Sequence, residues 1–322
     1  MSNHFIKCGK TRLSINLVMM IMLSLFFLRC TKEAKEYPYH IIDEIPSGDA
    51  CGIIVLPNGE YIYAATAPNV SVIRTSNNTI VDTIPVGGGP QFLTSLANGE
   101  YVYVTNTRPG ISVIRTSDNT IIDSISLSAP WGITALPDGD YVYVTGDSHD
   151  SVYVIQTSNN EIIAWISVDT GPTGVAASVD GEYVYVANFE SQNVSVIRTS
   201  DNTVVKTISL GKSSPYEIAV LPNGEYVYVT TSGRVMVIRT ADNAVVDSIP
   251  AGMPPIGIAA LPNSENIYVT SLETHDVAVI STSDNTVVER IKIGYLPDYI
   301  TVHPNGEYVY VTGYWGIKVI GF

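Results

Sequence analysis

One segment of the sequence, Asn-Gly-Glu-Tyr-Val-Tyr-Val-Thr, recurs seven times with variations. Successive copies are 40, 40, 42, 43, 40 and 42 residues apart, and they are centred on Tyr61, Tyr101, Tyr141, Tyr183, Tyr226, Asn266 and Tyr308. A repeat near 40 residues that is built from short alternating strands is typical of a β-propeller blade. The sequence therefore predicts one all-β domain over residues 40–322, a seven-bladed β-propeller.

Each unit divides into four strands by its period-2 alternation and its turn residues. In the third unit these strands are expected at residues 132–136, 141–145, 151–156 and 161–168. A Pro-Asp-Gly-Asp turn separates the first two strands and a Thr-Ser-Asn-Asn turn separates the last two. Residues 40–322 show no helical period, so we expect four-stranded antiparallel blades throughout.

The first and last units are incomplete in complementary ways. The last unit has its first three strands and stops at Phe322 without a fourth. The text HIIDEIP of residues 40–46 precedes the first unit and matches the fourth-strand text TIVDTIP of residues 79–85. We therefore predict that Ile41–Ile45 pairs with Gly316–Ile320 and closes the ring, which would remove two open sheet edges.

Five short texts resemble the YVTN-type propeller repeat: YVYVTN (101–106), YVYVTG (141–146), YVYVAN (183–188), SVIRTSDNT (112–120) and TIPVG (83–87). The family includes archaeal surface-layer proteins and YncE-like secreted bacterial proteins. The resemblance covers residues 40–322 and implies the seven-bladed fold, but it implies little about activity, because related propellers serve as enzymes, metal centres and binding modules. The sequence departs from the family where its VID segment commonly has Asp and this chain has Arg74, Arg115, Arg198 and Arg239.

Residues 1–29 are expected to be an export signal. They carry four basic residues and no acid, and the apolar run LVMMIMLSLFFL spans residues 17–28. This arrangement is typical of a secretory signal peptide, and the run is short for a membrane span. Cys30 follows directly, as in bacterial lipoprotein signals, although those usually have a small residue where Arg29 stands. We expect Cys30 to be lipidated and residues 30–39 to form a tether; plain secretion and an uncleaved anchor are the alternatives.

The charge of the chain argues against a nucleic acid partner. The formal net charge of −14 becomes −18 once residues 1–29 are removed, whereas nucleic-acid-binding domains normally present a basic face. Of the three cysteines, Cys8 lies in the signal, Cys30 would carry lipid and Cys51 has no partner, so no disulfide is expected. No two cysteines have CxxC spacing, and we expect no metal, haem or other cofactor.

Several conspicuous side chains are better explained by structure than by function. Thirteen of the 20 tyrosines lie in the second strands, as six Tyr-x-Tyr pairs and Tyr268, whose partner position is Asn266. Both positions of a pair share one strand face, and these side chains would fill the space between blades. The four Arg residues are expected to be solvated or paired with fourth-strand acids such as Asp82, Asp123 and Asp247. His149 and His275 belong to different blades, so neither a metal centre nor a catalytic triad is expected there.

Variation between units is concentrated on one face of the predicted ring. The turns after the first and third strands are nearly uniform and share the turn face, whereas the loops on the opposite, loop face differ from unit to unit. We use "channel mouth" for the loop-face ends of the seven first strands and the loops around them. The candidate ligand-binding residues there are Gln91, Phe92, Trp131, Tyr216, Glu217, Asp298, Tyr299, His149, Phe189, His275, Tyr314 and Trp315. The alternative is that Trp131 and Phe92 merely cap the channel.

These features favour an exported, lipid-anchored binding or scaffold module at the cell surface, in the outer membrane or in the periplasm. The expected partner is a small molecule, a glycan or a surface protein. Surface propellers that resemble this chain include vitamin B12-capturing proteins, which makes nutrient capture one form of this function. The alternatives are a propeller enzyme, such as a lyase or a quinoprotein-like enzyme, and a surface-layer or adhesion component. No catalytic residue is predicted, because no catalytic constellation is evident.

Overall fold

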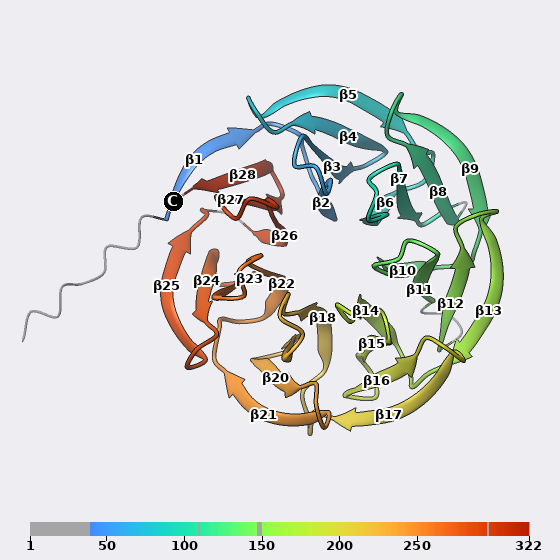
Figure 1. Cartoon of the computed structure of the whole chain (residues 1–322). Coiled ribbons are helices and arrows are strands. Elements are labelled where there is room, and N and C mark those ends of the chain that lie inside the picture. The colour runs from blue at the N-terminus through green and yellow to red at the C-terminus, as the bar shows by residue number, and fades with distance from the viewer. Residues whose placement is uncertain (1–38, 109, 147–149, 295, 322) are drawn as a thin grey trace, which may run out of the picture. The chain divides into compact units, whose positions relative to one another are not determined.

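Seven antiparallel sheets of four strands each follow one another around a ring in the computed structural model (Figure 1). The structure describes residues 39–322 apart from 109, 147–149, 295 and 322. The expected signal and residues 30–38 of the expected tether, with Cys30, lie outside the described residues, as does His149. The elements of the described part are all strands, and the predicted seven-bladed propeller is confirmed. This part contains no helix long and apolar enough to cross a membrane.

Each blade runs from an inner strand near the ring axis to an outer strand at the rim. The inner strands of blades one to seven are β2 (Ile53–Val55), β6 (Pro90–Ser95), β10 (Pro130–Ala135), β14 (Pro172–Ala177), β18 (Pro215–Val220), β22 (Pro255–Ala260) and β26 (Pro297–Val302). The second strands are β3 (Tyr61–Thr66), β7 (Tyr101–Asn106), β11 (Tyr141–Gly146), β15 (Tyr183–Asn188), β19 (Tyr226–Thr231), β23 (Asn266–Ser271) and β27 (Tyr308–Gly313).

The remaining two strands of each blade form its outer half. The third strands are β4 (Asn69–Arg74), β8 (Gly110–Arg115), β12 (Ser151–Gln156), β16 (Asn193–Arg198), β20 (Val235–Arg239), β24 (Asp276–Ser281) and β28 (Gly316–Gly321). The outer strands are β5 (Thr79–Pro85), β9 (Thr120–Ser126), β13 (Glu161–Ser167), β17 (Thr203–Ser209), β21 (Ala244–Ile249), β25 (Thr286–Lys292) and, for blade seven, β1 (His40–Ile45). The strands predicted for blade three agree with those observed to within two residues at each end.

Strand β1 comes first in the chain yet completes the last blade (Figure 1). It pairs antiparallel with β28, and Glu44 lies opposite Lys318 and forms an ion pair with it. The side chain of Ile45 is buried in the core between blades seven and one. The predicted pairing of Ile41–Ile45 with Gly316–Ile320 is therefore confirmed.

The core of the propeller lies between neighbouring blades, in seven apolar clusters. The second of these two strand positions is a tyrosine in all seven blades and is at most 2% exposed; the residues are Tyr63, Tyr103, Tyr143, Tyr185, Tyr228, Tyr268 and Tyr310. Each aromatic ring fills the space between two blades, as the strand pattern predicts, because a large flat side chain suits the contact of two sheet faces.

The Arg residues at the ends of the third strands have different partners from those expected. Three of them pair with an Asp of their own turn three residues later, in the pairs Arg115–Asp118 (2.6 Å), Arg198–Asp201 (2.5 Å) and Arg239–Asp242 (2.7 Å). The predicted pairing with outer-strand acids is wrong for these three, because the turn Asp is closer. The outer-strand acids Asp82, Asp123 and Asp247 instead accept hydrogen bonds from Asn side chains of the next blade.

Candidate functional site

The channel mouth is shaped by one position near the start of each inner strand, two residues after the proline that opens six of the seven. Four blades have glycine at this position, and an added Cβ would strike the backbone of the next blade at each one: Gly52, Gly132, Gly174 and Gly257. Glycine is therefore needed for the blades to approach this closely. The other three blades carry large side chains at the same position, namely Phe92, Glu217 and Tyr299.

Hydrogen bonds between blades fix the backbone of the mouth. A second-strand Thr donates to a carbonyl oxygen at the start of the next inner strand in Thr145–Thr173 (2.7 Å), Thr230–Ile256 (2.8 Å) and Thr270–Asp298 (2.6 Å). Blades one and four have Ala65 and Ala187 at that position. There the bridge to the next blade comes from the Gly52 amide (2.7 Å to Gln91 O) and the Thr173 hydroxyl (3.0 Å to Tyr216 O).

Three aromatic candidates from three different blades meet at the mouth. The ring of Phe92 lies 4.7 Å from that of Tyr299 in an edge-to-face arrangement, and 5.6 Å from that of Trp131. Blade one lies between Phe92 and Tyr299, and its residue at this level is Gly52, which places no side chain between them. Trp131 is 36% exposed, whereas Phe92 and Tyr299 are half-buried. The rings partly cover the mouth, and Trp131 still offers an open aromatic face.

Two carboxyl groups, those of Glu217 and Asp298, interact electrostatically with Tyr299 of this group. Burial raises the pKa of Glu217 to about 8, with Asp298 as a smaller cause. Burial also raises the pKa of Asp298 to about 6, assisted by Asp49. The pKa of Tyr299 is raised well above its usual value by burial and then by Glu217 and Asp298, which places residues of blades five and seven within one electrostatic environment.

The Cys51 thiol belongs to the same environment. Burial raises its pKa to about 11, and Asp298 and Asp49 add to the effect. The thiol is therefore protonated at neutral pH, whereas a nucleophilic cysteine needs a lowered pKa.

The remaining candidates lie apart from this group. Phe189 packs on Tyr216 with ring centroids 5.0 Å apart, between blades four and five. Tyr314 and Trp315 form an edge-to-face pair at 4.7 Å in the loop of blade seven, and they are 54% and 61% exposed. His275 has a positive φ of 53°, and its carbonyl oxygen accepts hydrogen bonds from the start of the following loop, which indicates a role in loop geometry.

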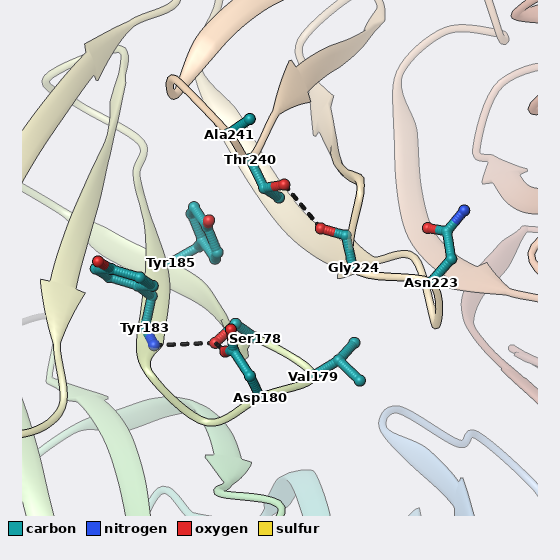
Figure 2. Close-up of a pocket in the computed structure, with 9 residues that line it drawn as sticks. All are labelled: Ser178, Val179, Asp180, Tyr183, Tyr185, Asn223, Gly224, Thr240 and Ala241. Atoms are coloured by element: carbon teal, nitrogen blue, oxygen red, sulfur yellow. Dashed lines mark hydrogen bonds between the residues drawn. The ribbon is translucent and has the colours of Figure 1, made fainter.

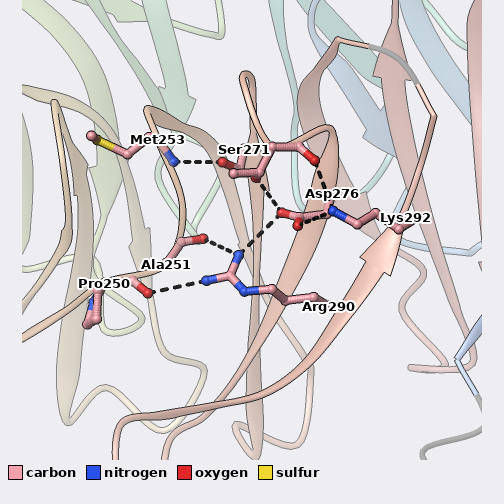
Figure 3. Close-up of polar contacts among 8 residues, drawn as sticks. Pro250, Ala251, Met253, Ser271, Asp276, Arg290 and Lys292 are labelled. Carbon is pink, nitrogen blue, oxygen red and sulfur yellow. Dashed lines mark hydrogen bonds and ion pairs between the residues drawn. The ribbon is translucent and has the colours of Figure 1, made fainter.

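Sequence reasoning missed a charged network in blade six (Figure 3). Asp276, which the repeat pattern treats as an ordinary turn residue, is only 1% exposed. Its carboxylate accepts hydrogen bonds from Thr274 Oγ1 (2.7 Å), Arg290 Nη1 (3.3 Å) and Lys292 Nζ (3.1 Å). Arg290 Nη1 also donates to Ala251 O in the preceding loop (3.2 Å), so the network links the outer strand to the loop before the blade. The sequence feature that could have indicated this network is the presence of two cations, Arg290 and Lys292, in one outer strand.

Cavities also lie on the turn face, between neighbouring blades, where none was predicted. One of 410 Å³ between blades four and five is lined by residues that include Tyr183, Tyr185, Asp180 and Thr240 (Figure 2). Others of 350 and 390 Å³ lie between blades one and two and between blades seven and one. None of these three is lined by a predicted site residue. The uniform turns predict a face with a structural role only, and no sequence pattern indicates the cavities between neighbouring blades.

No protein-family model and no curated relative matches the sequence. Hydrazine synthase from Kuenenia stuttgartiensis is similar in structure, with a TM-score of 0.79 and 21% identity over 88% of this chain and 97% of that chain. The β-propeller domain of Cps50 (Swd1) from Myceliophteria thermophila has a TM-score of 0.76 and 11% identity over 88% of this chain and 100% of that domain. Likeness at such identities shows the fold alone. The chain is a seven-bladed β-propeller that resembles these two.

Proposed function

We propose that this propeller is an exported binding module that takes up its ligand at the channel mouth. The observation that carries the proposal is the meeting of Phe92, Trp131 and Tyr299, from three separate blades, beside two carboxyl groups. Aromatic surface with a few convergent polar groups is the usual composition of a ligand site. The partly exposed Trp131 at the channel mouth offers an aromatic contact for a small molecule, a glycan or a loop of a surface protein.

Two further features support an extracytoplasmic setting. The basic and apolar segment of residues 1–29 and the adjacent Cys30 favour export followed by lipidation. Intact-mass spectrometry of the mature protein tests this step. A species that begins at Cys30 and carries acyl chains is the expected result. An unacylated species would favour secretion, and a retained N-terminus would favour an uncleaved anchor.

A fluorescence screen tests the mouth itself. The double variant Trp165→Phe/Trp315→Phe leaves Trp131 as the sole tryptophan of the chain. Titration of this protein with a panel of metabolites and soluble glycans should identify a compound that changes its emission. The direct binding of that compound, measured by calorimetry on the wild type, should be lost on Trp131→Ala and on Phe92→Ala.

A matched control lies at the rim of the same blade as Trp131. Trp165 is 74% exposed on outer strand β13, so Trp165→Ala removes an aromatic side chain far from the ring axis and should leave binding unchanged. Binding that survives both mouth substitutions but is lost when the turn face is altered would overturn the assignment of the site.

A further inference from the structure

A three-residue hydrogen-bonding unit recurs between blades on the turn face. The buried tyrosine of one blade donates to an Asn in the turn after the third strand of the next blade, and that Asn donates back to an Asp on the outer strand of the first blade. Between blades one and two, Tyr63 Oη lies 2.5 Å from Asn119 Oδ1, and Asn119 Nδ2 lies 2.9 Å from Asp82. The same unit appears as Tyr103–Asn160–Asp123 and Tyr228–Asn285–Asp247.

The equivalent positions between blades four and five are Tyr185, Asn243 and Lys206. Lys206 lies opposite Val196 in the strand register, as Asp82 lies opposite Val72, so a cation stands where the other units have the acid. Asn243 keeps the left-handed turn conformation of its counterparts, with a φ of 55°. Its Oδ1 is buried and has no hydrogen-bond partner among the described residues.

The other two residues of this unit, Tyr185 and Lys206, also lack partners. Neither the Tyr185 hydroxyl nor the Lys206 ammonium has a hydrogen-bond or ion-pair partner in the part of the chain that the structure describes. Between blades three and four Tyr143 still bonds Asn202 (2.7 Å), and between blades seven and one Asn78 still bonds Asp43 (2.9 Å). Between blades six and seven the unit is replaced: β1 supplies the outer strand of blade seven, so that blade has no turn after its third strand, and Tyr268 packs edge-to-face on Tyr39. Asn243 Nδ2, the Tyr185 hydroxyl and the Lys206 ammonium are thus donors without an acceptor among the described residues. The group missing from this interface is the acid that accepts from the Asn in the intact units.

The 410 Å³ cavity of Figure 2 lies at this interface, and Tyr185 is part of its wall. Its volume is in the range of small-molecule sites. Tyr183 and Val179 give the wall apolar surface, and Val179 is 49% exposed. The acid in the wall, Asp180, already accepts hydrogen bonds from the Ser178 hydroxyl (2.5 Å) and the Glu182 amide (3.0 Å), which lower its pKa.

We propose that a small organic carboxylate binds at this interface, with its apolar part in the cavity and its carboxylate at the place of the acid that the repeat lacks between blades four and five. The carboxylate would accept a hydrogen bond from Asn243 Nδ2 and would face the Lys206 ammonium. The Tyr185 hydroxyl would then donate to Asn243 Oδ1, as its counterparts do in the intact units. The intact units show that an Asn amide in this turn conformation can donate to a carboxylate. The apolar part of the ligand would lie against Tyr183 and Val179. This site is on the turn face and is independent of the channel mouth.

Calorimetric titration of the protein with phenylacetate tests the site, with phenylacetamide as the neutral probe of the same shape. Phenylacetate should bind at least about tenfold more tightly, because a charge-assisted hydrogen bond is about twice as strong as a neutral one. Lys206→Asp should weaken phenylacetate binding at least about tenfold, since the new acid completes the interblade unit and repels the ligand. Lys212→Met removes an exposed lysine just beyond β17 and should leave the binding unchanged.

A thermal melt of each variant separates loss of the site from loss of the fold. Lys206→Asp should melt at the same or a higher temperature than the wild type, and Lys206→Ala copies the Ala164 that blade three carries at this position. Lys206→Ala should also weaken phenylacetate binding. Equal affinity for the two probes, no binding of phenylacetate, or unchanged affinity in the folded Lys206→Asp variant would each overturn the proposal.

Discussion

Residues that depart from the repeat at single positions place ionisable groups at the channel mouth. At the inner-strand position that is glycine in four blades, blade five has Glu217, whose carboxyl group interacts electrostatically with Tyr299 and with a second acid, Asp298. No charge of opposite sign is among the causes of its pKa shift. A buried acid without a neighbouring cation lowers the stability of the fold, and such groups are typical of functional sites.

The raised pKa of Glu217 predicts a definite pH dependence of stability. Because the folded-state pKa is raised from 4.5 to about 8, the fold prefers the protonated acid, and stability falls as the pH rises between these values. Glu217→Gln removes this titration. The variant should unfold like the wild type near pH 4 and be more stable at pH 9, by about 1–3 kcal/mol once partial exposure to solvent is allowed for.

Urea denaturation at several pH values measures this difference. The exposed loop residue Glu273 provides the control, and Glu273→Gln should follow the wild-type profile. A Glu217→Gln profile that runs parallel to that of the wild type from pH 4 to pH 9 would contradict the argument.

At the scale of the strand, the outer edge of every blade is irregular, and in most blades it is also apolar. Two adjacent β-branched residues are exposed on several outer strands, as in Ile80 and Val81 of β5 and Val245 and Val246 of β21. The register shifts at this point in each of the seven outer pairs. A bulge twists the edge strand, which hinders its pairing with another chain.

Blade six adds an ionic element to its outer half, and the two sides of that network should not contribute equally. Asp276→Asn keeps the shape found as Asn69 and Asn193 in blades one and four, and its cations are partly exposed, so we expect a loss of about 1–2 kcal/mol. Arg290→Ala/Lys292→Ala leaves the buried carboxylate without a cation, and we expect a loss of about 3–5 kcal/mol. Chemical denaturation measures both, and equal losses would mean that the Asp276 carboxylate is not the critical buried charge.

For the whole molecule, the sequence was sufficient to predict the ring and its closure, but it was not sufficient to predict the interaction partners of individual side chains. Blade number and strand order follow from a pattern that is repeated seven times, and the mouth residues follow from which strand ends share a face. The network of Asp276 with Arg290 and Lys292 could not be derived in the same way, because it depends on which long side chains reach one carboxylate. The interblade units join residues more than 50 positions apart, and only their register in space reveals where one is broken.

Ring closure by β1 is a property of the whole molecule, and its removal is the severest test of the fold. Deletion of residues 40–46 takes away the outer strand of blade seven, the buried Ile45 and the Glu44–Lys318 ion pair, and it exposes the edge of β28. Loss of several kcal/mol in a chain of this size should lower the Tm by about 10 °C or more. The free edge should also promote association of chains. A protein that lacks only residues 1–38 is the control and should melt as the full chain does, whereas an unchanged Tm after deletion of 40–46 would contradict closure by β1.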